Sequence, residues 1–459
     1  MGHSFANDRA RKAAPRRRTA HTRVRMMNDM QKMRATDYQR VPWRAANTLL
    51  RAAQKVGLAR FPLDVQQLLD DARKATGLDD FGDERFLEPL QVLVRSTNEE
   101  ARLNPLGRWL ARSNIERLLQ ARLRAQDLFR RHPEILARRM PDPVVIVGLG
   151  RSGTTRLHRL LASDQRFLHL KSWESVYPVP TPECFAARAA GQPDPRIKAL
   201  DGALKAVLYT SPQVEAVHPL GTLEVEEELG LLQHAMTSQI FEIINELPSF
   251  AEYIMTHDQH YAYEYMVDLM KLVSWFRGDP QDKPWVLKTP QHMQDTDALL
   301  HVFPGARLIC PHRDPIKVVG SVCSTAWNSL VRDNDHVDPY QVGRHWLDKT
   351  ERMLHKNFRD RQLCPPQQQY DVLYADITAD WEQAMRGIYT FLGMPFEEQA
   401  RSGMAAWLDS NAQHKHGAHK YSLEQFGLDR DEVDARLMFY RERFDIPYET
   451  RNPHLKAEQ

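Results

Sequence analysis

One stretch decides the fold of this chain: Val144-Val145-Ile146-Val147-Gly148-Leu149-Gly150-Arg151-Ser152-Gly153-Thr154-Thr155. Gly148 and Gly153 have the spacing of the phosphate loop Gly-x-x-x-x-Gly-Lys-Ser/Thr, but Thr154 stands where that loop has its lysine. The apolar run before Gly148 predicts a buried strand, and residues 157–162 predict the first turns of a helix. A turn between such elements offers backbone N–H groups and a positive helix end to an anion.

The missing lysine limits what the loop can bind. Without that cation the chain lacks the group that handles the β- and γ-phosphates during nucleotide hydrolysis, so we expect a phosphate ester that is not cleaved as ATP is. Two other functions stay open at this point. One is a small-molecule kinase or nucleotide hydrolase of the same fold, and the other is a protein that binds an adenine nucleotide without turnover.

Two downstream segments narrow the choice, namely Pro284-Trp285-Val286-Leu287-Lys288-Thr289-Pro290-Gln291-His292 and Ala306-Arg307-Leu308-Ile309-Cys310-Pro311-His312-Arg313-Asp314-Pro315, the latter followed by Ser321. With the first loop they resemble the sulfotransferase superfamily, especially its bacterial branch. The resemblance implies that 3′-phosphoadenosine 5′-phosphosulfate is the co-substrate. It assigns the 5′-phosphosulfate to Arg151, Ser152, Gly153, Thr154 and Thr155, and the 3′-phosphate to Arg313 and Ser321.

The position of Arg313 predicts phosphate binding independently of that resemblance. Arg313 follows an apolar strand at its carboxyl end, where the ligands of open parallel sheets collect, and a planar guanidinium binds a phosphate with two hydrogen bonds. Pro315 suits the first position of a helix, so Asp314 is expected to be its N-cap and Ser321 to lie in its first turns. The alternative is an Arg–Asp ion pair at a helix cap.

Composition indicates a cytoplasmic enzyme without a membrane span. The chain has 459 residues, 42% of them hydrophobic, and no run approaches 18 apolar residues. Its four cysteines, Cys184, Cys310, Cys323 and Cys364, have neither metal-site nor disulfide-framework spacing. Residues 1–45 contain twelve Lys and Arg against three Asp, which predicts a flexible basic arm. Peripheral contact of this arm with a membrane surface stays open, whereas a specific nucleic-acid partner is not expected.

Periodicity divides the rest of the chain into a helical N-terminal region at 46–140 and an α/β domain at 141–459. We expect a P-loop-like parallel sheet flanked by helices. An insertion at about 175–283, with helices near 198–209, 223–247 and 260–276, is expected to form the acceptor pocket. The segments 370–377 and 388–395 resemble the family's later strand and helix end, although Ala375 replaces the usual acidic residue. Residues 415–423 loosely resemble its basic loop over the 3′-phosphate.

Sulfuryl transfer requires a base behind the acceptor hydroxyl and cations over the leaving oxygen, but it requires no metal. Lys288 ends an apolar strand and matches the family's catalytic lysine. The resemblance implies two competing candidates for the base. Glu174 is slightly favoured, because it follows the first loop at the spacing where related enzymes carry a catalytic glutamate, and His292 resembles the histidine that follows the lysine in other related enzymes. Residues 218–221 and Glu226–Glu228 are either part of the acceptor pocket or an exposed helix face, and we expect no catalytic role for them. The sequence therefore predicts a metal-independent sulfotransferase that acts on a hydroxyl of a small-molecule, lipid or carbohydrate acceptor.

Overall fold

The computed structural model describes residues 34–212, 221–411 and 421–449. Its centre is a four-stranded, fully parallel sheet in the order β4 (Val286–Lys288), β1 (Val144–Ile146), β5 (Arg307–His312) and β6 (Gln369–Leu373). Val145 of the central strand β1 pairs with Leu287 on one side and Leu308 on the other. The predicted α/β class and parallel sheet are confirmed.

The two faces of β1 pack into different hydrophobic cores. Val144 and Ile146 face the smaller core, which they share with α6 (Thr154–Ala162) and α19 (Trp381–Leu392). Val145 and Val147 face the larger core. Successive side chains of a strand point to opposite faces, so a strand covered on both faces is apolar throughout, as this one is.

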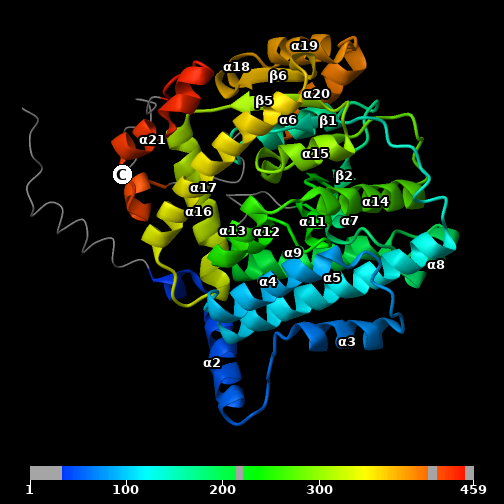
Figure 1. Cartoon of the computed structure of the whole chain (residues 1–459), viewed down its shortest axis with the longest axis vertical. Coiled ribbons are helices and arrows are strands. Elements are labelled where there is room, and N and C mark those ends of the chain that lie inside the picture. Colours follow the sequence, from blue (N-terminus) through cyan, green and yellow to red (C-terminus); the bar gives the residue numbers. More distant parts are fainter. Residues whose placement is uncertain (1–33, 213–220, 412–420, 450–459) are drawn as a thin grey trace, which may run out of the picture.

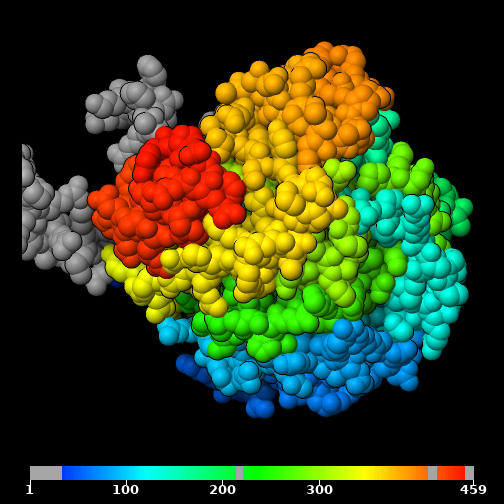
Figure 2. Space-filling view, turned by 45° about the horizontal axis from the view of Figure 1, so that its top comes forward, coloured from blue at the N-terminus to red at the C-terminus, as the bar shows by residue number. Residues whose placement is uncertain are grey.

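Helices cover both faces of the sheet (Figure 1). Those that follow the strands are α15 (Thr296–Val302), α16 (Pro315–Asp333), α17 (Pro339–Asp360), α18 (Tyr374–Ala379), α20 (Glu398–Ser410) and α21 (Arg430–Arg443). Short 3-10 turns lie at η3 (Pro290–Met293), η4 (Arg361–Leu363), η5 (Pro366–Gln368) and η6 (Leu423–Phe426). As predicted, Asp314 caps α16, and Gly393 ends α19 in the left-handed conformation. Figure 2 shows α21 beside the lobe of residues 374–411.

The N-terminal region is helical, as expected for residues 46–140. It consists of η1 (Ala35–Tyr38), α2 (Val41–Lys55), α3 (Val65–Thr76), η2 (Glu84–Phe86), α4 (Leu87–Glu99) and α5 (Pro105–Arg131). Helix α2 begins inside the stretch that was predicted to be a flexible arm. Its Asn47 is buried and accepts a hydrogen bond from the backbone N–H of Leu106 (2.9 Å), which fastens α2 to α5. The proposed domain boundaries stay predictions.

The insertion is less regular than predicted. Its elements are β2 (Leu170–Lys171), α7 (Ser172–Val176), α8 (Pro182–Ala189), α9 (Pro195–Thr210), β3 (Val225–Glu226), α11 (Leu229–Gln233), α12 (Ile240–Ile244), α13 (Pro248–Thr256) and α14 (His260–Arg277). The predicted helix at 223–247 is wrong, because Val225–Glu226 pairs with β2 and the left-handed residue Met236 (φ 61°) separates α11 from α12. The helices predicted near 198–209 and 260–276 are confirmed.

All four cysteines are buried free thiols. Within the described residues, no helix is both long enough and apolar enough to cross a membrane. The prediction of a cytoplasmic protein stays a prediction.

Candidate active site

The loop between β1 and α6 has the backbone expected of an anion-binding turn. Gly148 approaches Pro311 so closely that a Cβ at residue 148 would lie 2.9 Å from the Pro311 ring. Gly153 has φ +90°, and a Cβ there would lie 2.6 Å from the Tyr374 ring. Arg151 also adopts a positive φ (73°), which is uncommon for a residue with a side chain and is frequent at functional sites. The loop thus presents its N–H groups at the N-terminus of α6.

On one side of this loop lies a hollow of about 560 Å³, which we call the aromatic cleft. The loop and helices α6, α18, α19 and α20 form its walls, together with Arg313 at the carboxyl end of β5. Its lining comprises Arg151, Gly153, Thr154, Thr155, Arg156, Arg313, Tyr374, Thr378, Trp381, Trp407, Leu408 and Asn411. Three arginines and three aromatic rings in one cleft suit a ligand that carries both phosphate groups and a flat ring.

Arg313 links the predicted phosphate ligands. Its Nη1 donates to the backbone oxygen of Arg151 (2.8 Å), and Arg151 Nε donates to Ser321 Oγ (3.0 Å). The guanidinium also stacks on Tyr374, 4.1 Å from the ring centre. The structure thereby brings Arg151, Arg313 and Ser321 together, as the sequence led us to expect.

A carboxylate already engages Arg313. Glu449 accepts from Nε (2.7 Å) and from Nη2 (2.9 Å), in the two-pronged geometry that a phosphate would use. Burial acts to lower the pKa of Arg313, but Glu449 overcomes this and the pKa is raised. Of the basic loop predicted at 415–423, residues 415–420 lie outside the described residues. Tyr421 beyond them donates to the backbone oxygen of Lys317 at the start of α16 (3.1 Å).

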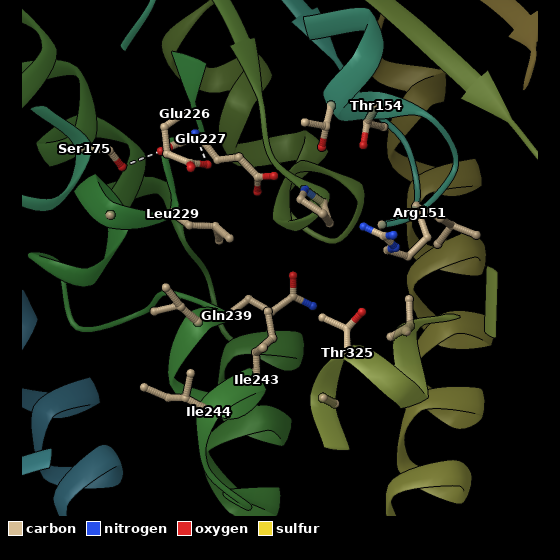
Figure 3. A pocket seen from close by; sticks show the side chains of 18 of the residues that line it. Arg151, Thr154, Ser175, Glu226, Glu227, Leu229, Gln239, Ile243, Ile244 and Thr325 are labelled. Carbon is tan, nitrogen blue, oxygen red and sulfur yellow. Dashed lines mark hydrogen bonds between the residues drawn. The ribbon is translucent and has the colours of Figure 1, made fainter. Parts of the chain in front are cut away.

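On the other side of the loop lies a cavity of about 360 Å³, which we call the apolar cavity (Figure 3). Much of its wall consists of aliphatic and aromatic side chains of α9, α12, α16 and α17. They are Leu200, Leu204, Ile240, Ile243, Ile244, Val318, Val322, Ala326, Trp346 and Met353. The polar lining comprises Arg151, Thr154, Thr155, Ser172, Ser175, Glu226, Glu227, Gln233, Gln239, Thr325 and Thr350. A largely apolar chamber with some polar groups is typical of a site for an amphiphilic small molecule.

Lys288 and Glu227 meet where the two hollows adjoin. Lys288 Nζ donates to Thr155 Oγ1 (3.2 Å) and forms an ion pair with the carboxylate of Glu227. The Lys288 side chain is only 1% exposed, whereas Glu227 and Thr155 line the apolar cavity. Figure 3 shows Glu227 on the opposite wall of the cavity from Arg151. The backbone oxygen of Glu227 accepts from Ser175 Oγ (2.6 Å), which holds this segment against α7.

The adjacent Glu228 holds the backbone of Lys288 in place. Its Oε2 accepts the backbone N–H of Lys288 (2.9 Å) and lies 3.5 Å from His292 Nε2. His292 Nδ1 is hydrogen bonded to Tyr263 Oη (2.8 Å), and both Glu228 and His292 are fully buried. The His292 side chain therefore lines neither hollow.

Glu174 also lies away from the junction. Its Oε2 accepts from the backbone N–H of Lys171 (2.9 Å) and from Arg277 Nη1 (3.1 Å) on α14. Burial raises the pKa of its carboxyl while Arg277 opposes the change. Ser172 and Ser175 on the same short helix line the apolar cavity, but the Glu174 side chain does not. The structure thus places the Lys288 ammonium beside Thr155 and Glu227, and it places neither Glu174 nor His292 there.

Several lining residues had no predicted catalytic or cofactor-binding role. For Glu227, a place in the acceptor pocket was one of two alternatives, and it was left out of the catalytic residues because a run of three glutamates also suits an exposed helix face. Trp381 and Trp407 belong to amphipathic helices without a local motif. One signal for Glu227 was its place between the two cofactor-binding segments. Residues 218–220 of the other unassigned motif lie outside the described residues. In the described part of the chain, no group of three or more His, Cys, Asp or Glu side chains has the arrangement of a metal site.

Comparison with known proteins agrees with this architecture. A mycobacterial enzyme, omega-hydroxy-beta-dihydromenaquinone-9 sulfotransferase Stf3 of Mycobacterium tuberculosis, is 27% identical over 298 residues, which are 62% of this chain and 71% of that protein. The crystal structure of sulfotransferase STF1 from Mycobacterium tuberculosis superposes with a TM-score of 0.70 at 29% identity over 81% of this chain and 98% of the other. For sulfotransferase STF9 from Mycobacterium avium the TM-score is 0.74 at 24% identity over 84% and 98%, which shows the shared fold. A sequence model of the sulfotransferase family matches residues 143–398, and the chain belongs to that family.

Proposed function

We propose that this sulfotransferase moves a sulfuryl group from 3′-phosphoadenosine 5′-phosphosulfate to the hydroxyl of a lipophilic alcohol. One observation carries the proposal: Arg151, Thr154 and Thr155 line both hollows, so that a donor in the aromatic cleft and an acceptor in the apolar cavity meet at one loop. Lys288 and Glu227 lie at that meeting point.

The donor suits the aromatic cleft. The N–H groups of residues 151–155 would bind the 5′-phosphosulfate, and Arg313 with Ser321 would bind the 3′-phosphate in exchange for Glu449. Trp381 and Trp407 offer ring faces to the adenine. Each charge-assisted contact to a phosphate contributes about 1.5–3 kcal/mol, so the 3′-phosphate would distinguish this donor from ATP.

The acceptor suits the apolar cavity. An alcohol with a hydrocarbon body would place its hydroxyl at the Ser172, Ser175 and Glu227 end and its body among the side chains of α9, α12, α16 and α17. The similar enzyme Stf3 acts on a hydroxylated menaquinone, which agrees with an apolar acceptor. A free sugar would leave most of its hydroxyls without hydrogen-bond partners in such a cavity.

Each residue then has a defined task in the transfer. Glu227 accepts the proton of the acceptor hydroxyl as the oxygen–sulfur bond forms. Lys288 moves from Glu227 to the bridging oxygen between sulfur and phosphorus. There it stabilises the negative charge that develops on this oxygen as its bond to sulfur breaks and 3′-phosphoadenosine 5′-phosphate leaves. Because this arrangement replaces Glu174 and His292 as bases, we assign His292 with Glu228 to the positioning of Lys288, and Glu174 to the anchoring of α7.

The test is a single-turnover assay with donor labelled in its sulfuryl group and a series of straight-chain primary alcohols. We expect a labelled sulfate ester whose formation continues in the presence of a chelator. A phosphate ester formed from ATP that requires magnesium would replace this proposal with a kinase. Tight binding of the donor without turnover on any alcohol would leave only the nucleotide-binding alternative.

A further inference from the structure

Helix α2 has an apolar stripe that no other part of the described structure covers. Val41, Ala45, Leu49, Ala52 and Val56 recur every three or four residues, so they share one side of the helix. Val41 is 66% exposed, Leu49 72% and Val56 73%. The opposite side, with Trp43, Asn47 and Leu50, packs against the body of the protein. Figure 1 shows α2 at the end of the molecule farthest from the sheet.

Cations lie beside this stripe. Arg44, Arg51 and Lys55 form a second row along α2, and between Asp37 and Asp64 the sequence has five Lys and Arg and no carboxylate. Arg51 forms an ion pair with Asp335, while Arg44 and Lys55 are exposed. An exposed apolar stripe flanked by cations is the pattern of a helix that lies in the interface of an anionic membrane.

The ends of the helices that wall the apolar cavity lie next to α2. Arg40, directly before α2, stacks on Tyr209 of α9 at 5.0 Å, and Leu204 of the same helix lines the cavity. Trp43 Nε1 donates to the backbone oxygen of Arg332 (2.8 Å) at the end of α16, which also lines the cavity. A membrane surface in contact with α2 would therefore lie close to α9 and α16, two of the helices that line the apolar cavity.

We propose that α2 docks on an anionic membrane surface and so places the apolar cavity next to the bilayer that holds the acceptor. The docking is independent of the chemistry, whereas the delivery of the acceptor rests on the function proposed above. A second copy of the chain suits this surface less well, because a symmetric contact would place two rows of cations against each other. The sequence of residues 1–33 adds nine Lys and Arg against two Asp, which increases the attraction to anionic lipid.

The first test measures where α2 lies when vesicles are present. Because the native cysteines are buried, a single cysteine at Leu49→Cys can be labelled selectively with a polarity-sensitive fluorophore in the full chain. Leu363→Cys is the matched control, since Leu363 is also an exposed leucine (65%) but lies in η4. With vesicles of phosphatidylcholine and phosphatidylglycerol we expect a blue shift at residue 49 and none at residue 363. Phosphatidylcholine alone should give little shift.

The second test compares variants by vesicle cosedimentation. Leu49→Asp should weaken binding to the anionic vesicles about tenfold or more, and Arg44→Gln with Lys55→Gln about fivefold per cation, whereas Leu363→Asp should have no effect. If Leu49→Asp binds as tightly as the unmodified chain, or if the blue shift appears without vesicles as the chain dimerises, the docking proposal is overturned.

Activity distinguishes this proposal from the proposed function. Leu49→Asp should slow transfer to a long-chain alcohol held in anionic vesicles, yet leave transfer to a short, water-soluble alcohol unchanged. Failure of transfer to both alcohols in the unmodified chain would contradict the proposed function without affecting the docking. Equal rates for Leu49→Asp and the unmodified chain on the vesicle-held alcohol would overturn the delivery role.

Discussion

The aromatic cleft and the apolar cavity share one loop but are built in different ways. The cleft takes Arg151 and Arg313 from turns at the carboxyl ends of β1 and β5 and Arg156 from the first turn of α6, so the positions of these charges follow from the parallel sheet. The cavity takes most of its lining from helices of the insertion and from the sides of α16 and α17. Under the proposed function, donor recognition would therefore depend on a few polar contacts, while acceptor recognition would depend on the shape and extent of an apolar surface.

Polar contacts in the cleft and apolar contacts in the cavity also differ in the binding free energy that each contact contributes. A charge-assisted hydrogen bond contributes about 1.5–3 kcal/mol and is lost as a whole when one partner is removed. Burial of one methylene contributes about 0.8 kcal/mol and can be added or removed in steps. The predictions below test whether the cleft and the cavity follow these two patterns.

The largest effect is expected at the junction of the two hollows. Glu227→Gln removes the proposed proton acceptor and should lower kcat about 10²- to 10⁴-fold, while affinity for 3′-phosphoadenosine 5′-phosphate should change little. Glu174→Gln is the matched control, and it should lower stability more than rate because Glu174 is paired with Arg277 away from the cavity. Single-turnover kinetics with a binding titration measures both. A nearly inactive Glu174→Gln beside an active Glu227→Gln would restore the original assignment of the base.

In the cleft, loss of Arg313 should weaken binding of 3′-phosphoadenosine 5′-phosphate by about one to two decades, because a charge-assisted phosphate contact disappears. Affinity for ADP should change much less, since ADP has no 3′-phosphate. Isothermal titration calorimetry measures both affinities. Arg307→Ala is the control, because Arg307 begins β5 at the end opposite the cleft and donates to the backbone oxygen of Phe391 (3.2 Å). Equal losses for the two nucleotides would contradict the assigned 3′-phosphate site.

In the cavity, each methylene added to a primary alcohol should lower KM about fourfold until the chamber is filled, which corresponds to about 0.8 kcal/mol per group. The KM of the donor should not depend on the alcohol. Initial rates over a homologous series of alcohols provide the measurement. A KM independent of chain length would mean that the hydrocarbon body does not enter the apolar cavity.

The smallest effect is expected at Glu449, whose carboxylate forms an ion pair with Arg313 of the aromatic cleft. Glu449→Gln should tighten binding of 3′-phosphoadenosine 5′-phosphate up to about fivefold, because a partly exposed ion pair that competes for Arg313 contributes at most about 1 kcal/mol. Glu442→Gln, an exposed position on α21, should leave the affinity unchanged. Weaker binding in Glu449→Gln would instead mean that Glu449 helps to orient Arg313 for the ligand.

The comparison explains which predictions from the sequence were successful. The four strands, α6, the cap at Asp314 and the contacts among Arg151, Arg313 and Ser321 follow from local motifs next to strands, where the backbone pattern determines the position. The single helix at 223–247 was wrong because the pairing of Val225–Glu226 with β2 is a contact between distant segments. Resemblance to related enzymes favoured Glu174 slightly over His292 as the base, and that prediction stays untested. In space, the Glu174 carboxylate pairs with Arg277 and does not line the apolar cavity.

The sequence by itself determined the sheet, the anion loop and the family, because each depends on residues that act within one strand, turn or helix. Tertiary structure alone decided which of Glu174, Glu227 and His292 lies beside Lys288 and lines the apolar cavity. Glu174, just before the insertion, and Glu227, inside it, are both acidic residues, but Glu174 forms an ion pair with Arg277 at the end of α14 while the segment after β3 brings Glu227 to Lys288. Such a choice depends on which neighbours satisfy each buried charge, and those neighbours lie about a hundred residues away from Glu174 and about sixty from Glu227.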